Sequence, residues 1–302
     1  MPNAIIELRD VSKKYHLAEN PAIKNVSLEI RERERLGLVG ANGSGKTTLM
    51  RLMLSFVLPD SGEIRIMGYD DIEKARQNIG FVAERQEGLE NFTPRELLKI
   101  SARMHGLDGA ESAGRIDSLL RFAEISEVGD QLIADFSKGM AQRVQICLAL
   151  LHQPKILLLD EPMSGLDPGG QKDVRQMLEK IKDITLVFAS HNLDEIESFC
   201  NSVVFLDHGE IVARKKLTEI HKVVFTLETT PAAKPLLFKY FDSTLQMLAE
   251  KSNHLKVRFE ADSDVFQKFA AELTESGLEI KRLRSTGILE NLYHQYVYRR
   301  TN

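Results

Sequence analysis

The sequence contains little of what marks secreted, membrane-spanning or metal-clustered proteins. It has no Trp and only two cysteines in 302 residues, and Cys147 and Cys200 stand far apart without His or Cys neighbours at metal-ligand spacing. Both are expected to be buried thiols, which excludes a disulfide scaffold. The longest apolar runs, Ile146 to Leu151 and Ile156 to Leu159, are far shorter than the ~20 residues that cross a bilayer. The first residues show no basic region followed by an apolar stretch, so no secretory signal is expected.

The sequence also lacks a strong excess of either charge. Lys and Arg total 40 against 44 Asp and Glu, a formal net charge of −4. Because nucleic-acid binding depends on clustered positive charge, no nucleic acid is expected as a partner. The composition, 43% hydrophobic and 28% charged, is that of a folded protein, and the length predicts two domains.

The hydrophobic pattern predicts an α/β fold followed by a small α+β domain. An amphipathic helix is expected over 46–57, and a helical insertion occupies about 85–153. A helix beginning near Pro168 separates two short apolar runs, which is βαβ spacing and indicates parallel strands. The predicted domains are 1–220 and 221–302. Predicted strands of the first domain are 5–11, 35–39, 63–67, 78–82, 156–159, 185–189, 203–206 and 211–213, the last two joined by a hairpin turn at 207–210. Beyond this domain we expect strands at 223–227, 254–259 and 279–283 and helices at 232–241, 263–276 and 287–296.

A phosphate-binding loop is the strongest motif. The segment from Gly40 to Thr47 reads Gly-Ala-Asn-Gly-Ser-Gly-Lys-Thr, which matches G-x-x-x-x-G-K-[ST] between a predicted strand and a predicted helix. Its backbone N–H groups and the helix N-terminus suit phosphate oxygens, Lys46 suits the β- and γ-phosphates, and the Thr47 hydroxyl suits Mg²⁺. The residues predicted to bind the nucleotide here are Gly40, Asn42, Gly43, Ser44, Gly45, Lys46, Thr47 and Thr48.

Two carboxylates follow the apolar strand 156–159. Ligands of parallel sheets bind at the carboxyl ends of the strands, so Asp160 and Glu161 are expected beside the phosphate loop. Asp160 suits the Mg²⁺ shell, and Glu161 suits deprotonating the attacking water.

At this point the chain resembles the ATP-binding subunits of ATP-binding cassette (ABC) transporters, from about Ile5 to Val212. Phe136-Ser137-Lys138-Gly139-Met140 is similar to the family's Leu-Ser-Gly-Gly-Gln signature, from which it departs at Lys138 and Met140. The resemblance implies that Ser137 and Gly139 meet the γ-phosphate of ATP held by a second cassette. The implied fold is a P-loop cassette with a mixed sheet and a helical subdomain.

Three further motifs carry the resemblance. Ser164-Gly165-Leu166-Asp167 looks like the D-loop, which places Asp167 at the nucleotide. Ser190-His191 looks like the switch histidine, so His191 is expected at the γ-phosphate or the attacking water. Tyr15 stands where the family stacks an aromatic ring on adenine.

The family's Q-loop glutamine is the least regular match. Ile79-Gly80-Phe81-Val82-Ala83 is followed by Glu84, with Gln86 two residues later. Because Glu84 directly follows this segment, at the position of the family's glutamine, we expect Glu84 to contact Mg²⁺. Gln86 remains the alternative.

The resemblance implies an ATPase, with ATP and Mg²⁺ as cofactors, that powers an integral membrane permease as a pair of cassettes, homodimeric or heterodimeric. The C-terminal segment 285–293 looks like the C-terminal end of bacterial exporter ATPases, which favours export. It reads Ser285-Thr286-Gly287-Ile288-Leu289-Glu290-Asn291-Leu292-Tyr293. The implied location is cytoplasmic, on the inner face of the membrane through the permease. The alternative is an ABC ATPase acting on ribosomes or DNA, but such members resemble tandem cassettes or carry long coiled coils, and neither is visible.

Overall fold

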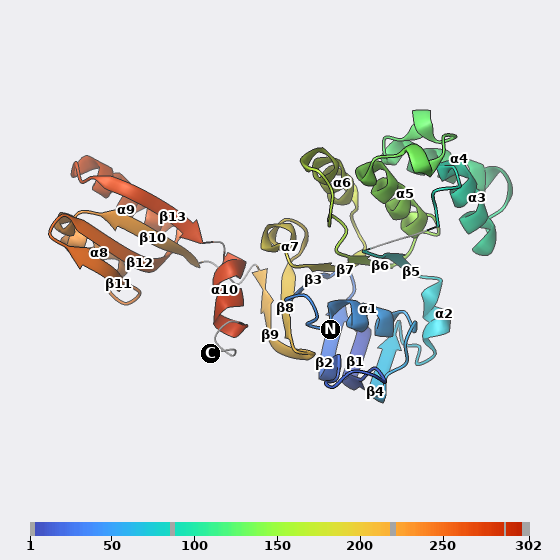
Figure 1. Ribbon diagram of the computed structural model, residues 1–302, viewed down its shortest axis with the longest axis horizontal. Coiled ribbons are helices and arrows are strands. Elements are labelled where there is room, and N and C mark those ends of the chain that lie inside the picture. The colour runs from blue at the N-terminus through green and yellow to red at the C-terminus, as the bar shows by residue number, and fades with distance from the viewer. Residues whose placement is uncertain (1–3, 85–87, 218–221, 287, 298–302) are drawn as a thin grey trace. The chain divides into compact units, whose positions relative to one another are not determined.

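The computed structural model describes residues 4–84, 88–217, 222–286 and 288–297 (Figure 1). The chain divides into two compact units, residues 1–214 and 215–302. Each unit has its own hydrophobic core.

The first unit contains two sheets. The smaller is antiparallel in the order β2-β1-β4, and the larger has the order β5-β6-β7-β3-β8-β9 with parallel pairing from β5 to β8. The strands are β1 (Ala4–Lys13), β2 (Ile23–Arg31), β3 (Arg35–Val39), β4 (Ser61–Ile66), β5 (Ile79–Val82), β6 (Ile156–Asp160), β7 (Thr185–Ser190), β8 (Ser202–Asp207) and β9 (Glu210–Lys216). This mixture of parallel and antiparallel strands confirms the predicted mixed sheet.

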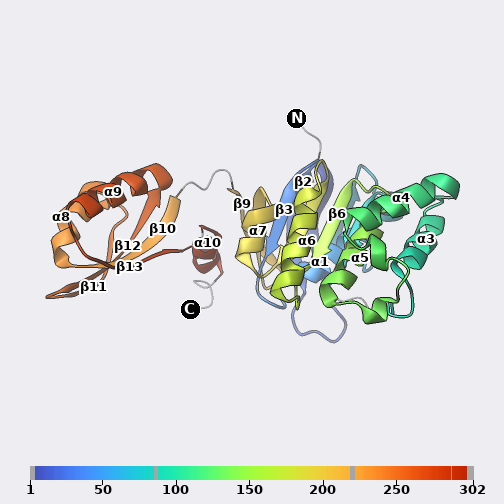
Figure 2. The same ribbon diagram turned by 90° about the horizontal axis from the view of Figure 1, so that it is seen from above.

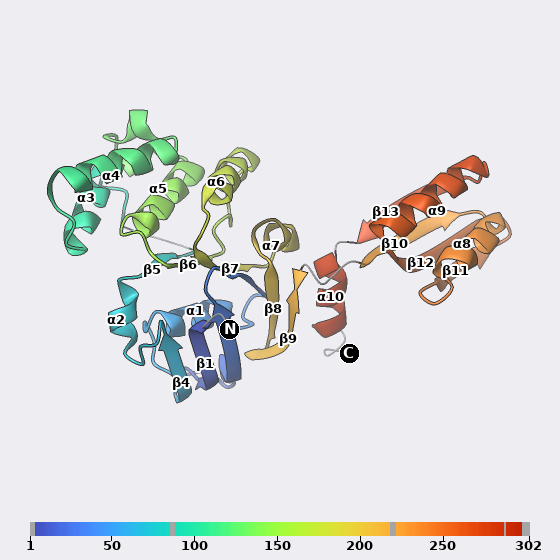
Figure 3. The ribbon, with the colours of Figure 1, turned by 180° about the vertical axis from the view of Figure 1, so that it is seen from behind.

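Helices connect and cover these strands. They are α1 (Lys46–Met53), α2 (Ile72–Arg76), α3 (Pro94–Met104), α4 (Gly109–Phe122), α5 (Lys138–Leu150), α6 (Pro168–Lys180) and α7 (Leu193–Phe199), with 3₁₀ turns at Ser126–Val128 and Ile133–Asp135. Figures 1 and 3 show α3, α4 and α5 gathered on the side of the large sheet away from β1, β2 and β4. This group corresponds to the predicted helical insertion.

The core of the first unit lies between the two sheets and α1. β6 and β7 are buried along their whole lengths, as expected for central parallel strands covered on both faces. Leu49, Met50 and Met53 of α1 are fully buried and pack into this core. The predicted helix 46–57 is too long, because it ends at Met53 and Ser55 has a φ of 54°.

The second unit is a βαββαβ arrangement with an added C-terminal helix. Its antiparallel sheet has the order β11-β12-β10-β13, in which β10 lies between the two later strands β12 and β13. Figure 2 shows α8 and α9 on one face of this sheet, where an aromatic cluster that includes Phe225, Phe259 and Phe269 fills the core. The elements are β10 (Lys222–Thr229), a 3₁₀ turn (Pro231–Ala233), α8 (Lys234–Phe241), β11 (Gln246–Lys251), β12 (His254–Asp262), α9 (Ser263–Glu275), β13 (Ile280–Thr286) and α10 (Ile288–Tyr296).

Candidate active site

The phosphate-loop motif forms the turn between β3 and α1. Gly43 and Gly45 have φ values of 82° and 111°, in the left-handed region that favours glycine, and Gly45 is the N-cap of α1. A Cβ on Gly40 would lie 2.3 Å from the carbonyl oxygen of Leu206, so any side chain there would force the loop away from β8. The loop is therefore fixed by close backbone contacts in the shape that presents its N–H groups.

Lys46 joins this loop to the carboxylate that follows β6. Its Nζ donates a hydrogen bond to the Gly40 carbonyl oxygen at 2.8 Å and lies 3.5 Å from Glu161 Oε1. The side chains are only 7% and 10% exposed, so little water screens the charge pair. The two strongest sequence motifs meet in one buried ion pair.

Glu161 also contacts the residue that follows β7. Its Oε2 lies 2.8 Å from Nδ1 of His191 and accepts a hydrogen bond from the His191 backbone N–H at 3.4 Å. Glu161 has a φ of 48°, a left-handed conformation that is uncommon for a non-glycine residue and concentrates at functional sites. One carboxylate thus contacts a buried cation through one oxygen and an exposed imidazole through the other.

Asp160 has the properties of a cation ligand. Burial raises the pKa of its carboxyl, while a hydrogen bond from Thr47 acts in the opposite direction. Its Oδ1 is buried and has no hydrogen-bond partner among the described residues. A buried, unpartnered carboxylate oxygen is costly unless a cation binds it, and together with the Thr47 hydroxyl it fits Mg²⁺.

No described group of three or more His, Cys, Asp or Glu side chains could hold a metal by itself. Apart from Glu84, the remaining Mg²⁺ ligands would therefore be phosphate oxygens and waters, the usual arrangement for this ion in nucleotide sites. Glu84 is exposed at the end of β5 and close enough to act electrostatically on Asp160. Gln86 lies outside the described residues.

Tyr15 and Thr48 lie together at the start of α1. The Tyr15 hydroxyl is 3.5 Å from Thr48 Oγ1, which places the ring beside the phosphate loop. Ser44 Oγ is buried without a hydrogen-bond partner in the described structure, and Asn42 is exposed. The unpartnered hydroxyl is a further group that a phosphate oxygen could satisfy.

The signature residues stand at the start of α5, beside the D-loop. Ser137 caps α5 by accepting the Met140 N–H, and Asp167 caps α6 by accepting the Gly170 N–H. A Cβ on Gly139 would lie 2.8 Å from Gly170 Cα, so the first turns of the two helices touch. Within the described part of the chain, no hydrogen bond or ion pair joins Ser137, Gly139 or Asp167 to the phosphate loop.

One buried carboxylate at this site was not predicted. Ser190 donates to Glu195 Oε2 at 2.7 Å and accepts the Asn192 N–H at 3.0 Å, so these residues hold the loop that carries His191. Burial raises the pKa of Glu195. The available signal was local: Glu195 follows Asn192 by three residues, the spacing of a capping pair at a helix start.

The fold and this site define a P-loop ATPase with a helical subdomain. The model of the ABC transporter family matches residues 23–164. The chain is 33% identical to the ABC transporter ATP-binding protein NatA of Bacillus subtilis, across 72% of this chain and 92% of NatA. It is 30% identical to the uncharacterized ABC transporter ATP-binding protein YxlF of the same organism, across 97% of this chain and 100% of YxlF. The chain belongs to the ATP-binding subunits of ABC transporters.

Two further comparisons extend the result. The Nod factor export ATP-binding protein I of Cupriavidus metallidurans is 32% identical across 72% of this chain and 73% of its own. The dimeric post-hydrolysis structure of the cassette MJ0796 with ADP and Pi superimposes with a TM-score of 0.63, at 28% identity, across 70% of this chain and 98% of that one.

Membership confirms the predicted family, fold class, ATPase activity and use of ATP with Mg²⁺. Subunits of this family dimerise and work with membrane permease components. The comparisons do not favour the alternative of an ATPase acting on ribosomes or DNA. In the described ranges, every helix is too short or too polar to span a bilayer.

Proposed function

We propose that this chain energises an exporter and that Glu161 is the general base of ATP hydrolysis. The observation that carries the assignment is the buried contact of Glu161 with Lys46 on one side and His191 on the other. A base must lie within hydrogen-bond reach of the proton it accepts, and this carboxylate stands between the phosphate-loop cation and an exposed imidazole. His191 orients the carboxylate and the attacking water.

The other predicted residues take the roles that their positions support. The backbone from Gly40 to Thr48 holds the phosphates, and Tyr15 stacks on adenine. Thr47, Asp160 and Glu84 would supply oxygen ligands for Mg²⁺, and the bound ion would neutralise charge that develops on the phosphates. Water is deprotonated at Glu161, while Lys46 stabilises the phosphate oxygens.

A second cassette completes each site. Ser137 and Gly139 lie at a helix N-terminus that has no bond to this chain's own phosphate loop among the described residues, and Asp167 lies on the adjacent helix. An N-terminus of this kind attracts phosphate. We therefore assign these three residues to the ATP of the partner cassette, whether it is a copy of this chain or a related one.

The permease is expected to dock beside Glu84 and α3. Phe92 is 37% exposed in this region, whereas Leu97 and Leu98 are buried and belong to the packing of α3. A movement of Glu84 with the γ-phosphate would shift this surface. Docking there would hold the chain at the cytoplasmic face of the membrane, with residues 221–302 as an accessory domain.

Export rests on two observations. The Nod factor export protein is among the relatives. The Ser-Lys-Gly-Met signature and the Leu289-Glu290 ending are similar to those of exporter ATPases. The direction is tested by assembling the chain with its permease in inverted vesicles, where an exporter accumulates substrate on adding ATP. Accumulation only in right-side-out vesicles supplied internally with ATP would show import instead.

The base is tested with Glu161→Gln, which preserves the shape of the side chain. We expect ATP binding to persist and hydrolysis to fall by roughly 100-fold or more. Glu127→Gln, an exposed glutamate in the same unit, is the matched control and should retain the parental rate. Near-parental hydrolysis by Glu161→Gln would remove Glu161 from the role of base.

A further inference from the structure

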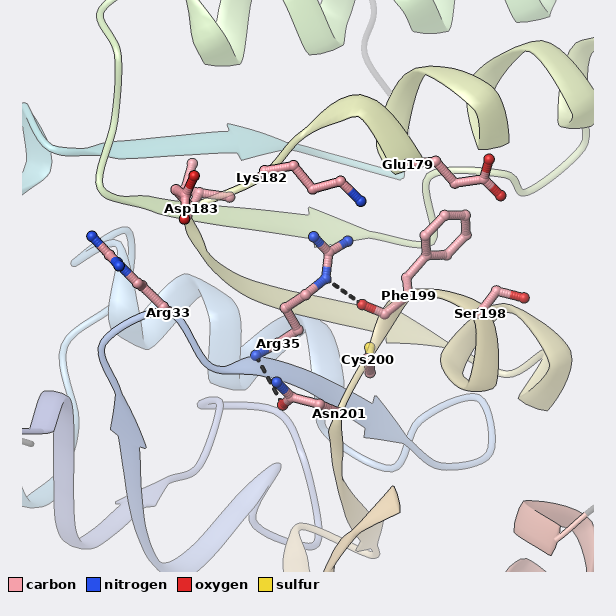
Figure 4. A pocket seen from close by; sticks show the side chains of 10 residues that line it. Arg33, Arg35, Glu179, Lys182, Asp183, Ser198, Phe199, Cys200 and Asn201 are labelled. Carbon is pink, nitrogen blue, oxygen red and sulfur yellow. Dashed lines mark hydrogen bonds between the residues drawn. The ribbon is translucent and has the colours of Figure 1, made fainter. Parts of the chain in front are cut away.

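A cavity lies at the opposite ends of the strands that carry the ATP site. It has a volume of about 410 Å³ and is formed where β3, β7 and β8 begin and where α6 and α7 end (Figure 4). The phosphate loop follows the carboxyl end of β3 and His191 follows the carboxyl end of β7, so the cavity is separate from the nucleotide site. Its lining includes Arg33, Arg35, Lys182, Glu179, Asp183 and Asn201.

Arg35 is a partly buried cation whose charge no acid balances among the described residues. Its Nε and Nη1 donate to the carbonyl oxygens of Phe199 and Ile181, at the ends of α7 and α6. Burial lowers the pKa of its guanidinium, and in the described ranges it forms no ion pair. Two carbonyl acceptors leave Nη2 without any described hydrogen bond, so the guanidinium can still donate into the cavity.

Lys182 brings a second positive charge to the same space. Figure 4 shows the Lys182 ammonium and the Arg35 guanidinium in the middle of the cavity, while Glu179 and Asp183 lie at its opposite ends. Lys182 also forms no ion pair among the described residues, although two acids line the cavity with it. Lys182 is exposed, so its long side chain can turn and bring the ammonium to an anion held beside Arg35.

We propose that this cavity is a second anion site for a small ligand bearing a carboxylate or a phosphate group. The planar Arg35 guanidinium would donate a charge-assisted hydrogen bond through Nη2, and the flexible Lys182 ammonium would close over the anion. The side-chain oxygen of Asn201 accepts the Arg35 backbone N–H, which leaves its amide NH₂ as a neutral donor at the rim. The volume accommodates a small metabolite and is too small for a folded partner.

The site is tested by calorimetric titration of the full chain with inorganic phosphate and, separately, with malonate. The protein is first saturated with Mg²⁺ and a non-hydrolysable ATP analogue, which fills the γ-phosphate position, so that the phosphate loop cannot contribute a second binding event. We expect saturable binding of at least one probe, and the stronger of the two identifies the headgroup. Lys182→Ala should weaken this binding at least about tenfold, because one charge-assisted hydrogen bond is lost.

Lys180→Ala is the matched control. Lys180 is the last residue of α6, two positions before Lys182; it pairs with Glu124 and does not line the cavity. It should bind the probes as the parental chain does. The absence of saturable binding to either probe, or equal affinity of Lys182→Ala and the parental chain, would overturn the proposal. ATP binding and hydrolysis by Lys182→Ala should be unchanged, so the outcome is independent of the assignment of Glu161.

Discussion

The substitution Gly139→Ala adds a methyl group that has two opposite effects on the free energy of unfolding. Alanine favours a helix over glycine by about 0.5–1 kcal/mol in an interior, and less in the first turn where Gly139 stands. Against this gain, the new Cβ would lie 2.8 Å from the backbone of Gly170, a distance that real Cβ contacts essentially never show. Because the obstacle is main chain, α5 and α6 must separate.

The clash outweighs the gain. Forcing an extra methyl into a packed contact costs typically 1–3 kcal/mol, so we expect Gly139→Ala to lower the free energy of unfolding by about 1–2 kcal/mol. The separation would also stretch the Arg143–Asp173 ion pair between the same helices, at 3.7 Å. ATP hydrolysis should fall as well, because Ser137 moves relative to Asp167.

Gly114→Ala is the matched comparison. Gly114 lies in the middle of α4, and a Cβ there would meet nothing within 4 Å. This substitution should raise the free energy of unfolding by about 0.5–1 kcal/mol, through helix propensity alone. Urea unfolding followed by far-ultraviolet circular dichroism measures both variants. If Gly139→Ala were as stable as Gly114→Ala, contact between the two helices would not limit that position.

The core of the site could be predicted because its parts are local motifs at the ends of strands. The loop from Gly40 to Thr47 is contiguous, and parallel strands bring their carboxyl ends to one edge. That rule, applied to the sequence, is enough to place Asp160 and Glu161 near the loop. The direct ion pair of Lys46 with Glu161 could not be predicted, since it depends on side-chain packing between segments more than 100 residues apart in the sequence.

Two strands were missed for different physical reasons. β11 is exposed at every residue, so no apolar alternation marks it, and pairing with β12 alone defines it as an edge strand. Buried and exposed residues do alternate along β2, but Asn25 has a left-handed backbone, with a φ of 49°, and interrupts this alternation near the start of the strand. The predicted helix end at residue 57 is wrong because helical apolar spacing continues in the sequence beyond Met53, whereas the left-handed backbone of Ser55 ends the helix.

Three further outcomes follow from single contacts. Mixing Lys46→Ala chains with Ser137→Arg chains should restore part of the ATPase activity that each pure variant lacks, since one composite site stays intact; no rescue would contradict assignment of Ser137 to the partner's ATP. Gly40→Ala should weaken Mg·ATP binding by at least about tenfold in calorimetry, because the Cβ displaces the loop from the Leu206 carbonyl. Acidification from pH 7.5 to 5.5 should destabilise the chain through His152, as measured by urea unfolding.

The sign of the His152 effect follows from its surroundings. Burial lowers its pKa, the neighbouring His105 ring at 4.3 Å lowers it further, and a hydrogen bond to the Ile79 carbonyl opposes both. The folded chain therefore binds fewer protons here than the unfolded chain once the pH falls below the ordinary value of about 6.5. The contribution of His152 to the free energy of unfolding is therefore present above that pH and is lost as the pH falls towards the lowered pKa of His152. His152→Gln should lose less stability between the two pH values than the parental chain. The exposed His16→Gln should lose as much as the parental chain, and equal losses in all three proteins would show that His152 is not the group responsible.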